Sequence, residues 1–477
     1  IDGKVLVTDA EYVEVEGYGK IPLDENYKIY KIYEEIAQEL TNSILVGYES
    51  TDFIVAEGKI VAALIKEPIK AENIRVLIKS QQFESIYHKE VSLTSNTEFT
   101  VTTGEESLTY PAGTTVAYTA DDDGLLEERV TIRPVEENGK ITLLSFDRSY
   151  GNPSYRGSME IAVGENGILI VNELPLEEYL YAVVPSEMPS SYGLEAVKSQ
   201  AVCARSYAYN HLMANSLKEY GAHVDDSVSY QVYNNIEENE ETILAVKDTY
   251  GKVMKHGGSV INAYYFSTSS GHTASVGEVW GGEAEYLKGK SQQLQTEEEV
   301  PVATDNNQVD FSKEETFREF ILKPSYPTYD SDFPWYRWKT TLSFKNIADR
   351  VNSIIASRYQ AKADYIQTLV KSESGEETYE SIPIESIGTL KDINILKREK
   401  SGIVTQIKLV GSERTVKVIG EDKIRMMLAP GSQGLVRQDD SKQDNLSMLP
   451  SAFFIMDKEG ESLGITGGGY GHGVGMS

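Results

Sequence analysis

The spacing of small apolar residues in the middle of the chain predicts a long helix. From residue 194 on, an apolar side chain recurs every three or four positions, at Leu194, Val197, Ala201, Ala204, Ala208 and Leu212. This period places the six side chains on one face of an α-helix. Because three of the six are alanines, a second element can approach that face closely. We expect residues 173–215 to be mainly helical.

Alternating patterns predict strands before this helix. Between residues 73 and 172, runs such as IRVLIK, TEFTVTT, KITLLSF and GILIVN are separated by clusters of Gly, Asp and Asn. This is the pattern of a β-rich sheet domain or small barrel. Residues 1–72 mix strand-like runs with YKIYKIYEEIAQEL at 27–40, whose isoleucines have helical spacing. We expect residues 1–72 to form a small α+β unit of unknown role.

Strand-like runs return after the helix, and VINAYYFST at 260–268 is the strongest. A polar, acidic stretch at 285–332 predicts an inserted, partly flexible excursion, and SESGEETYES at 372–381 predicts a long exposed loop. The expected fold class is α+β with several domains. These are an N-terminal unit at 1–72, a β-rich accessory domain at 73–172, and a mixed α/β core at 173–477 built around the Ala-rich helix.

The charge of the chain narrows the classes of partner. Its 477 residues include 45 Lys and Arg against 74 Asp and Glu, a formal net charge of −29. This excess argues against nucleic-acid binding and against an anionic membrane surface. No apolar run reaches the ~20 residues that span a bilayer. The chain begins at Ile1 rather than Met, so a removed leader or membrane anchor is compatible with it.

No metal or cofactor site is predicted. Cys203 is the single cysteine, which excludes an internal disulfide and a cysteine-based zinc site. The six histidines include no HExxH motif and no close ligand pair. The glycine-rich GGGYGHGVGMS at 467–477 fits neither GxGxxG nor a P-loop. We interpret its glycines as positions where the backbone closely approaches a ligand or a neighbouring strand.

One carboxylate has unusual neighbours. Glu187 lies between Pro185 and Pro189, among apolar residues. The prolines restrict the chain on both sides, and the apolar neighbours should raise the pKa of the carboxyl. A carboxyl that keeps its proton near neutral pH can act as general acid in glycosidic-bond cleavage. On spacing alone, a glutamate that caps the following turn is the better-supported alternative.

A hydroxyl-rich stretch, FSTSSGHTA at 266–274, raises the question of a serine nucleophile with His272. The stretch lacks a GxSxG elbow, and a histidine so close in sequence cannot easily reach its own serine. We interpret it instead as a hydrogen-bonding loop that lines a polar groove.

Taken together, five stretches resemble the SpoIID/LytB family of peptidoglycan-active proteins. They are LPLEEYLYAVVPSEMP (174–189), LEAVKSQAVCARSYA (194–208), YFSTSSGHTASVGEVWGG (265–282), PWYRWKTTLSF (334–344) and GGGYGHGVGMS (467–477). Their order and spacing agree over roughly residues 73–477, whereas residues 1–72 lie outside the resemblance.

The resemblance implies a lytic transglycosylase that cleaves peptidoglycan glycan strands between N-acetylmuramic acid and N-acetylglucosamine. The glutamate of the family's E-M-P motif corresponds to Glu187. It would protonate the glycosidic oxygen and then accept the proton of the muramoyl 6-hydroxyl, which leaves a 1,6-anhydro end. No second catalytic carboxylate and no cofactor are required, unlike in ordinary glycosidases. Other motif positions are expected to line the glycan-binding groove: Lys198, Arg205, Tyr207, Ser267, Ser269, Trp280, Tyr336 and His472.

One departure from the family pattern concerns metals. Some sporulation members have the zinc-ligand pattern D-L-C-D-D-x-x-x-C-Q-V-Y, whereas this chain has HVDDSVSYQVY at 223–233. Val224 and Tyr230 stand where the cysteines would be. We therefore expect the scaffold of that loop without its zinc site. The scaffold residues that remain are Asp225, Asp226, Gln231 and Tyr233.

Two other functions stay open. Some LytB-type relatives are described as amidase modifiers, so the chain could be a non-catalytic glycan-binding module that stimulates a cell-wall amidase. A purely structural surface protein built on residues 1–172 is a third hypothesis. The expected partners are peptidoglycan glycan strands, with a cell-wall amidase as a further candidate. The expected location is extracellular or at the cell surface.

Overall fold

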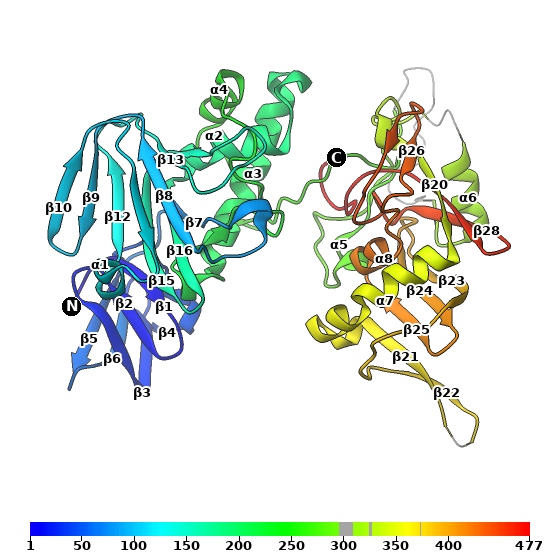
Figure 1. Cartoon of the computed structure of the whole chain (residues 1–477), viewed down its shortest axis with the longest axis horizontal. Coiled ribbons are helices and arrows are strands. Elements are labelled where there is room, and N and C mark those ends of the chain that lie inside the picture. Colours follow the sequence, from blue (N-terminus) through cyan, green and yellow to red (C-terminus); the bar gives the residue numbers. More distant parts are fainter. Residues whose placement is uncertain (295–308, 324–326, 373) are drawn as a thin grey trace. The chain divides into compact units, whose positions relative to one another are not determined.

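The computed structural model of the chain describes residues 1–294, 309–323, 327–372 and 374–477. They form two compact units, Ile1–Ala263 and Tyr264–Ser477 (Figure 1). Both units contain helices and strands, and several sheets are present, which confirms the expected α+β class. The boundaries predicted at residues 72 and 172 lie inside the first unit.

The N-terminal segment folds as a six-stranded sheet. The strand order is β1-β2-β3-β6-β5, and β4 pairs with β3. The strands are β1 (Val5–Thr8), β2 (Tyr12–Val15), β3 (Gly19–Lys31), β4 (Ala37–Gln38), β5 (Thr51–Ala56) and β6 (Lys59–Ile65). One face of this sheet covers a small apolar core that includes Val13, Ile29 and Phe53.

The helix predicted over residues 27–40 is wrong. β3 continues through Lys31, and β4 follows it. Ile29 is buried in the sheet, whereas Ile36 and Leu40 are exposed, so the apolar residues of this stretch share no face. Alternating tyrosines and isoleucines favour extended backbone, because aromatic and β-branched side chains pack well on a pleated sheet.

Two further sheets confirm the β-rich character of residues 73–172. Their strand orders are β10-β9-β12-β15-β16-β7-β17 and β11-β8-β13-β14. All pairs are antiparallel except β17 with β7, which is parallel. The strands are β7 (Asn73–Leu77), β8 (Glu90–Ser95), β9 (Phe99–Thr103), β10 (Glu106–Tyr110), β11 (Val116–Thr119), β12 (Val130–Pro134), β13 (Ile141–Leu143), β14 (Ser154–Tyr155), β15 (Ser158–Gly164), β16 (Gly167–Pro175) and β17 (Val224–Asp225).

Helices complete the core of the first unit. α2 (Leu176–Glu187) begins directly at the end of β16, α3 (Leu194–Ala214) follows it, and α4 (Glu240–Asp248) packs on both. The stripe predicted on α3 is confirmed: Val197, Ala201, Ala204, Ala208 and Leu212 are buried. These residues belong to the same apolar cluster as the sheets, so one core extends across residue 172. The remaining elements of this unit are α1 (Asp123–Glu127), β18 (Lys255–His256) and β19 (Ser259–Val260).

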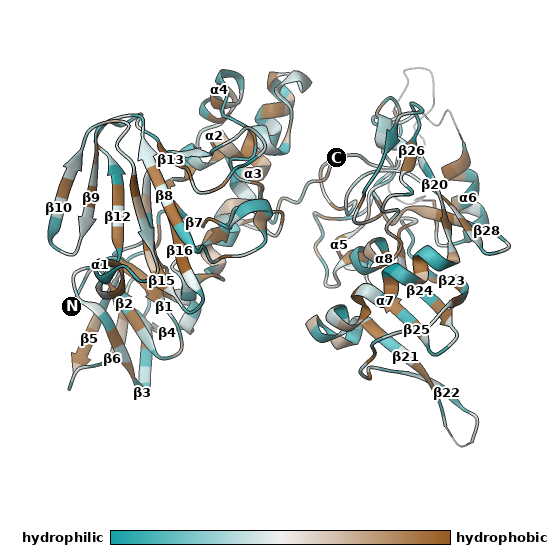
Figure 2. Ribbon diagram, in the orientation of Figure 1, coloured by the Kyte–Doolittle hydropathy of each residue, from teal (hydrophilic) through white to brown (hydrophobic). Residues whose placement is uncertain are grey.

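The second unit is built on two five-stranded sheets, ordered β27-β26-β20-β29-β28 and β22-β21-β25-β24-β23. Its strands are β20 (Trp338–Ser343), β21 (Ile366–Lys371), β22 (Glu377–Glu380), β23 (Leu390–Arg398), β24 (Val404–Gly411), β25 (Thr415–Ile419), β26 (Leu435–Arg437), β27 (Lys442–Gln443), β28 (Phe454–Glu459) and β29 (Ser462–Gly467). Its helices are α5 (Val276–Val279), α6 (Glu314–Leu322), α7 (Phe344–Ala361) and α8 (Glu421–Met427). Figure 2 shows α7 with alternating hydrophilic and hydrophobic stretches, as expected for a helix that packs on β23.

Short 3-10 turns connect several of these elements. They lie at Thr41–Ser43, Gln81–Phe83, Ser190–Tyr192, Lys218–Tyr220, Pro334–Tyr336 and Ala363–Tyr365. In the described part of the chain, no helix is both long and apolar enough to cross a membrane.

The strand predicted at 260–268 is wrong beyond its first residue, because β19 ends at Val260. The chain then pairs with the glycine-rich tail through isolated bridges, such as Tyr265 with Met476 and Thr268 with Tyr470. Alternate glycines of the tail have φ between +81° and +119°. A segment with left-handed residues at every second position cannot offer a regular ladder to a partner strand.

The two polar stretches predicted as loops also contain regular structure. Within 285–332, residues 295–308 and 324–326 lie outside the described residues. The described part includes α6, whose phenylalanines are buried in the core. Within 372–381, residue 373 lies outside the described residues, and β22 pairs with β21 as an antiparallel hairpin.

Candidate functional site

Glu187 is the last residue of α2, and the two prolines around it define the end of that helix. Pro185 lies in the last turn. Pro189 disfavours helical backbone at the residue before it, and Met188 is accordingly extended, with φ −140° and ψ 126°. The side chain of Glu187 is half-buried. The restriction by both prolines, predicted from the sequence, therefore fixes where the helix presents its final carboxylate.

A segment far along the chain binds this carboxylate. The backbone N–H of Val232 donates a hydrogen bond to Oε1 of Glu187 at 2.8 Å. We call residues 231–236 the docking segment. A donor directed at a carboxylate oxygen fixes its orientation and favours its ionised form. The raised pKa that the sequence predicts for Glu187 stays a prediction.

Two buried side chains hold the docking segment in place. Gln231 accepts a hydrogen bond from the hydroxyl of Tyr179 in α2, and its amide nitrogen donates to the carbonyl of Ala204 in α3, both at 3.3 Å. The hydroxyl of Tyr233 donates to Oδ1 of Asn172 in β16 at 2.7 Å. The segment is thus bonded to both helices and to the sheet.

Two aspartates organise the loop before the docking segment. Asp226 is fully buried, pairs with Arg148 at 2.7 Å and accepts the N–H of Lys79 at 3.0 Å. Burial raises the pKa of Asp226 to about 6, against the lowering effect of Arg148. Asp225 accepts the N–H and the hydroxyl of Ser227, at 2.8 and 2.6 Å. Both carboxylates therefore serve the conformation of the loop.

Aromatic rings gather in the same region. The ring centroids of Tyr207 and His211, one turn apart on α3, are 4.2 Å apart, and His211 meets Tyr230 edge-on at 5.1 Å. All three side chains are half-buried. Burial raises the pKa of Tyr179 well above its ordinary value, and the nearby charges of Glu187 and Tyr207 raise it further.

Arg205, a predicted groove residue, is buried and bonded inside the protein. Its Nε and Nη2 each donate to the carboxylate of Glu177 at 2.7 Å. Other bonds from its guanidinium reach the carbonyls of Val246 and Lys252. These contacts join α3 to the start of α2 and to the end of α4. A role of Arg205 in glycan binding stays a prediction. A glycan that bound the guanidinium would compete with these hydrogen bonds.

Lys198, also predicted to bind substrate, lies at the surface of α3. Its ammonium is 3.0 Å from Glu195 and 3.0 Å from Asp248. Hydrogen bonds to Asp248 and Glu195 raise its pKa. Lys198 is therefore charged at neutral pH, and its role in binding stays a prediction.

The remaining predicted groove residues belong to the second unit, which carries its own aromatic cluster. The ring centroids of Trp280 and His472 are 4.8 Å apart, and Tyr264 lies 4.8 Å from Trp280. Trp280 is 47% exposed. Burial lowers the pKa of His472 to about 4, so its imidazole is neutral at neutral pH. The structure thus brings Trp280 and His472 together.

Ser267, Ser269 and Tyr336 differ in accessibility. Ser267 is exposed, whereas Ser269 is buried and its N–H donates to Asp330 at 2.7 Å. Tyr336 is buried beneath the guanidinium of Arg337, 3.9 Å from the ring centroid. Ser267 can meet a ligand as the fold stands, while Ser269 and Tyr336 support the fold of the second unit. Their predicted contacts with glycan stay predictions.

The positions where the family pattern has cysteines hold apolar and aromatic packing. Val224 is buried in β17, and Tyr230 packs on His211. Among the residues that the structure describes, no three His, Cys, Asp or Glu side chains are grouped so that they could hold a metal ion. Cys203 is buried in α3, and burial raises the pKa of its thiol to about 11.

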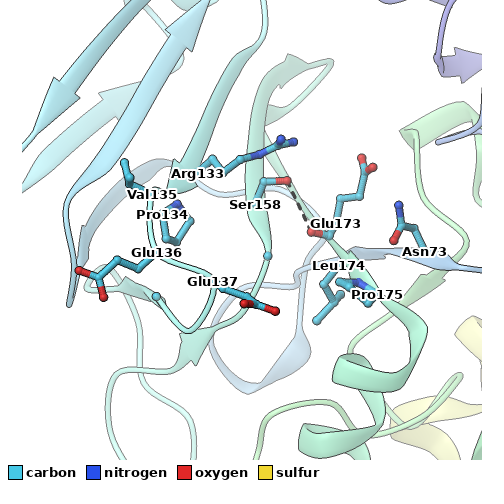
Figure 3. A pocket seen from close by; sticks show the side chains of 12 residues that line it. Asn73, Arg133, Pro134, Val135, Glu136, Glu137, Ser158, Glu173, Leu174 and Pro175 are labelled. Atoms are coloured by element: carbon cyan, nitrogen blue, oxygen red, sulfur yellow. Dashed lines mark hydrogen bonds between the residues drawn. The ribbon is translucent and has the colours of Figure 1, made fainter. Parts of the chain in front are cut away.

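None of the predicted site residues lines the cavity drawn in Figure 3. This cavity of about 240 Å³ lies between the turn after β12 and the end of β16. Its charged lining residues include Arg133, Glu137 and Glu173. The carboxylate of Glu173 is paired with Lys4 and Arg75. The cavity is therefore not assigned to the site around Glu187.

Sequence reasoning missed two groups that contact the end of α2. The N–H of Val232 is a backbone donor, which any residue except proline supplies, so no sequence signal marks it. Ser186 precedes Glu187 in the quoted motif, but its role depends on which segment its hydroxyl meets. That partner lies about 50 residues further along the chain.

Comparison with known proteins gives two family matches. A model of the stage II sporulation protein family (SpoIID) matches residues 164–256. A model of a domain of unknown function (DUF8618) matches residues 358–475. The first match contains α2, α3 and the docking segment. The motifs quoted from residue 265 on lie outside it, so their link to the family stays a prediction.

Individual relatives agree with the first match. The chain is 27% identical to "Amidase enhancer" of Bacillus subtilis (strain 168) over 298 residues, which cover 62% of this chain and 36% of that protein. It is 38% identical to "Stage II sporulation protein D" of the same organism over 167 residues, 32% of this chain and 49% of that protein. The matched regions thus span half or less of these relatives. Residues 164–256 of this chain are therefore similar to the SpoIID family.

Proposed function

We propose that this protein acts on the bacterial cell wall as a lytic transglycosylase, with Glu187 as its single general acid and base. The observation that supports this best is the half-buried carboxylate at the end of α2, with Oε1 bound by the N–H of Val232, inside the region that matches the SpoIID family. The proposed substrate is the glycan strand of peptidoglycan, cleaved between N-acetylmuramic acid and N-acetylglucosamine. Such a substrate places the protein at the cell surface or outside the cell.

The reaction needs only one carboxyl group. Protonated Glu187 gives its proton to the glycosidic oxygen as the bond from that oxygen to the anomeric carbon breaks. The resulting carboxylate then takes the proton of the muramoyl 6-hydroxyl, whose oxygen forms the new bond to the anomeric carbon. A 1,6-anhydro end results, and water is not consumed. An enzyme that uses water would require a second carboxylate or a base for it.

The surroundings of Glu187 suit both steps. The Val232 N–H stabilises the negative charge that appears on the carboxylate after the first transfer. Tyr207, His211 and Tyr230 supply half-buried rings on which sugar faces can stack. Burial lowers the pKa of His211, so this residue adds no positive charge at neutral pH.

The test is digestion of purified glycan strands without peptide stems. We expect the wild-type protein to release fragments with 1,6-anhydro-muramoyl ends, detected by mass spectrometry. Glu187→Gln keeps the size of the side chain but cannot donate a proton, so it should release none. Absence of anhydro ends with the wild type, or equal release by Glu187→Gln, would contradict the proposal.

A second candidate function is a non-catalytic module that binds glycan and stimulates a cell-wall amidase. It is favoured by the similarity to a protein named "Amidase enhancer", which extends over 62% of this chain. In this case the protein would bind glycan strands without cleaving them and would accelerate the release of stem peptides by an added amidase. The same Glu187→Gln variant would then stimulate the amidase as well as the wild type does.

A further inference from the structure

The last turn of α2 and the docking segment are joined by hydrogen bonds from several backbone N–H groups of that segment. Besides the bond from Val232 to Glu187, the N–H groups of Asn235 and Ile236 both donate to the hydroxyl of Ser186, at 3.2 and 3.1 Å. Glu187 and Ser186 are neighbours in sequence. One turn of helix therefore receives three donors from one short segment.

The Ser186 hydroxyl is suited to this task by its own hydrogen bond. It donates to the carbonyl of Ala182, four residues earlier, at 2.8 Å. This bond uses its proton, so its oxygen lone pairs face the docking segment and accept the two N–H groups. The same Ala182 carbonyl also accepts the N–H of Asn234 at 3.2 Å.

The docking segment bends to present these N–H groups. Asn234 has φ +57°, a left-handed conformation that asparagine tolerates better than most residues. Its side chain is fixed on both ends, because Oδ1 accepts the hydroxyl of Tyr150 at 2.7 Å and Nδ2 donates to the carbonyl of Ser154 at 2.8 Å. The docking segment is thus hydrogen-bonded to the sheet domain on one side and to α2 on the other.

We propose that Ser186 is a positioning residue for Glu187: its hydroxyl anchors the docking segment so that the Val232 N–H stays on Oε1 of the carboxylate. This inference rests on the proposed acid and base role of Glu187. The Val232 N–H is thereby kept on the carboxylate that is proposed to transfer the proton. The same donor stabilises the carboxylate between the two proton transfers.

Removal of the anchor has a defined consequence. Without the Ser186 hydroxyl, the N–H groups of Asn235 and Ile236 lose their acceptor, and the bonds of Gln231, Tyr233 and Asn234 are left to hold the docking segment. The Val232 donor is then less firmly placed on the Glu187 carboxylate, so the ionised form is less favoured and the orientation of the carboxylate is less defined. The alkaline limb of the activity profile, where the acid loses its proton, therefore moves to higher pH.

Other titrating groups near this contact must be separated from Glu187. Besides burial, the pKa of Tyr179 is raised by the charges of four residues: Glu187, Tyr207, Asp225 and Asp226. Of these, Asp226 has a pKa near 6 and is paired with Arg148. A Glu187→Gln variant removes only the titration of Glu187, so it separates the two carboxyls.

The experiment compares Ser186→Ala, Ser186→Thr and Ser199→Ala in the full chain. Ser199 is a matched control, because its hydroxyl also donates to a carbonyl four residues earlier, Glu195 at 2.9 Å, on an exposed helix face. We expect Ser186→Ala to lower kcat for glycan cleavage about tenfold or more, since a misplacement of 1 Å can cost about a hundredfold. KM should stay near the wild-type value and the alkaline limb should move up. Ser186→Thr, which keeps the hydroxyl, and Ser199→Ala should behave as wild type.

A second measurement is independent of catalysis. With valine labelled by ¹⁵N, the amide proton of Val232 should follow a pH titration in the wild type that is absent in Glu187→Gln and reduced in Ser186→Ala. Two results would overturn the proposal. One is a Val232 amide whose pH titration in the wild type is the same as in Glu187→Gln. The other is a Ser186→Ala variant that matches Ser199→Ala in kcat, in the pH profile and in the titration of the Val232 amide. If the wild type forms no anhydro ends, the proposed function fails, while the titration still decides whether Ser186 positions Glu187.

Discussion

The guanidinium of Arg205 in α3 binds both carboxylate oxygens of Glu177, in the first turn of α2, with two hydrogen bonds of 2.7 Å. The side chain of Arg205 is 2% exposed and that of Glu177 is 17% exposed. The pair fixes the start of the helix whose end carries Glu187. It therefore joins the stability of the first unit to the position of the candidate site.

Arg205→Met should destabilise the first unit by about 3 kcal/mol or more, because it leaves a largely buried carboxylate without its cation. Urea unfolding followed by circular dichroism measures this loss. Lys198→Met is the control on the same helix, since the ion pairs of Lys198 are exposed to solvent, and it should unfold close to wild type. Equal unfolding midpoints for both variants would contradict this structural role for Arg205.

His223 should make the protein sensitive to acid. It is fully buried: Nδ1 accepts the N–H of Arg75 at 3.0 Å, and Nε2 therefore carries the proton and bonds to the carbonyl of Val46 at 2.9 Å. Burial lowers its pKa from 6.5 to about 3. Between pH 6.5 and 3, His223 is therefore protonated in the unfolded chain but neutral in the folded chain. The free energy of unfolding consequently falls as the pH drops from 6.5 towards 3.

His223→Gln removes this titration. The slope of the unfolding free energy against pH between 6.5 and 3 should be smaller in the variant than in the wild type, measured by urea unfolding at several pH values. Parallel slopes would show that His223 binds a proton in the folded state as easily as in the unfolded state.

The docking of residues 1–72 could not be predicted from sequence, and His223 shows the reason. Its partner Val46 lies 177 residues away along the chain. The ion pair between Arg129 and Glu14 likewise joins the N-terminal sheet to the β-rich sheet over 115 residues. Local patterns reveal elements, but not which distant polar groups meet. The predicted boundary at residue 72 therefore falls inside one compact unit.

Tyr230 should contribute to glycan binding through its ring. Tyr230→Ala removes the ring that packs against His211, and we expect affinity for stem-free glycan strands to fall several-fold, as the loss of about 1 kcal/mol of aromatic contact implies. Tyr230→Phe keeps the ring and should bind as the wild type does. Isothermal titration with Glu187→Gln as the common background measures binding without turnover. Unchanged affinity in Tyr230→Ala would remove this residue from the proposed groove.

The sequence predicts the elements of the site better than its contacts. The alanine stripe predicts α3 because a burial period of 3.6 residues is local information, and the two prolines indicate where α2 ends. The stretch at 27–40 is predicted as a helix because its isoleucines fit a helical period, although its tyrosines fit a strand. Pairing with a neighbouring strand determines that its first residues are extended. The Val232 N–H leaves no trace in a side-chain pattern, although it touches the carboxylate on which the proposed chemistry depends.

The most direct measurement is mass spectrometry of glycan strands without peptide stems after incubation with the wild type and with Glu187→Gln, at equal amounts of folded protein. The proposed function predicts 1,6-anhydro-muramoyl ends with the wild type and none with the variant. Anhydro ends released equally by both proteins, or by neither, would contradict Glu187 as the proton-transferring group of a lytic transglycosylase.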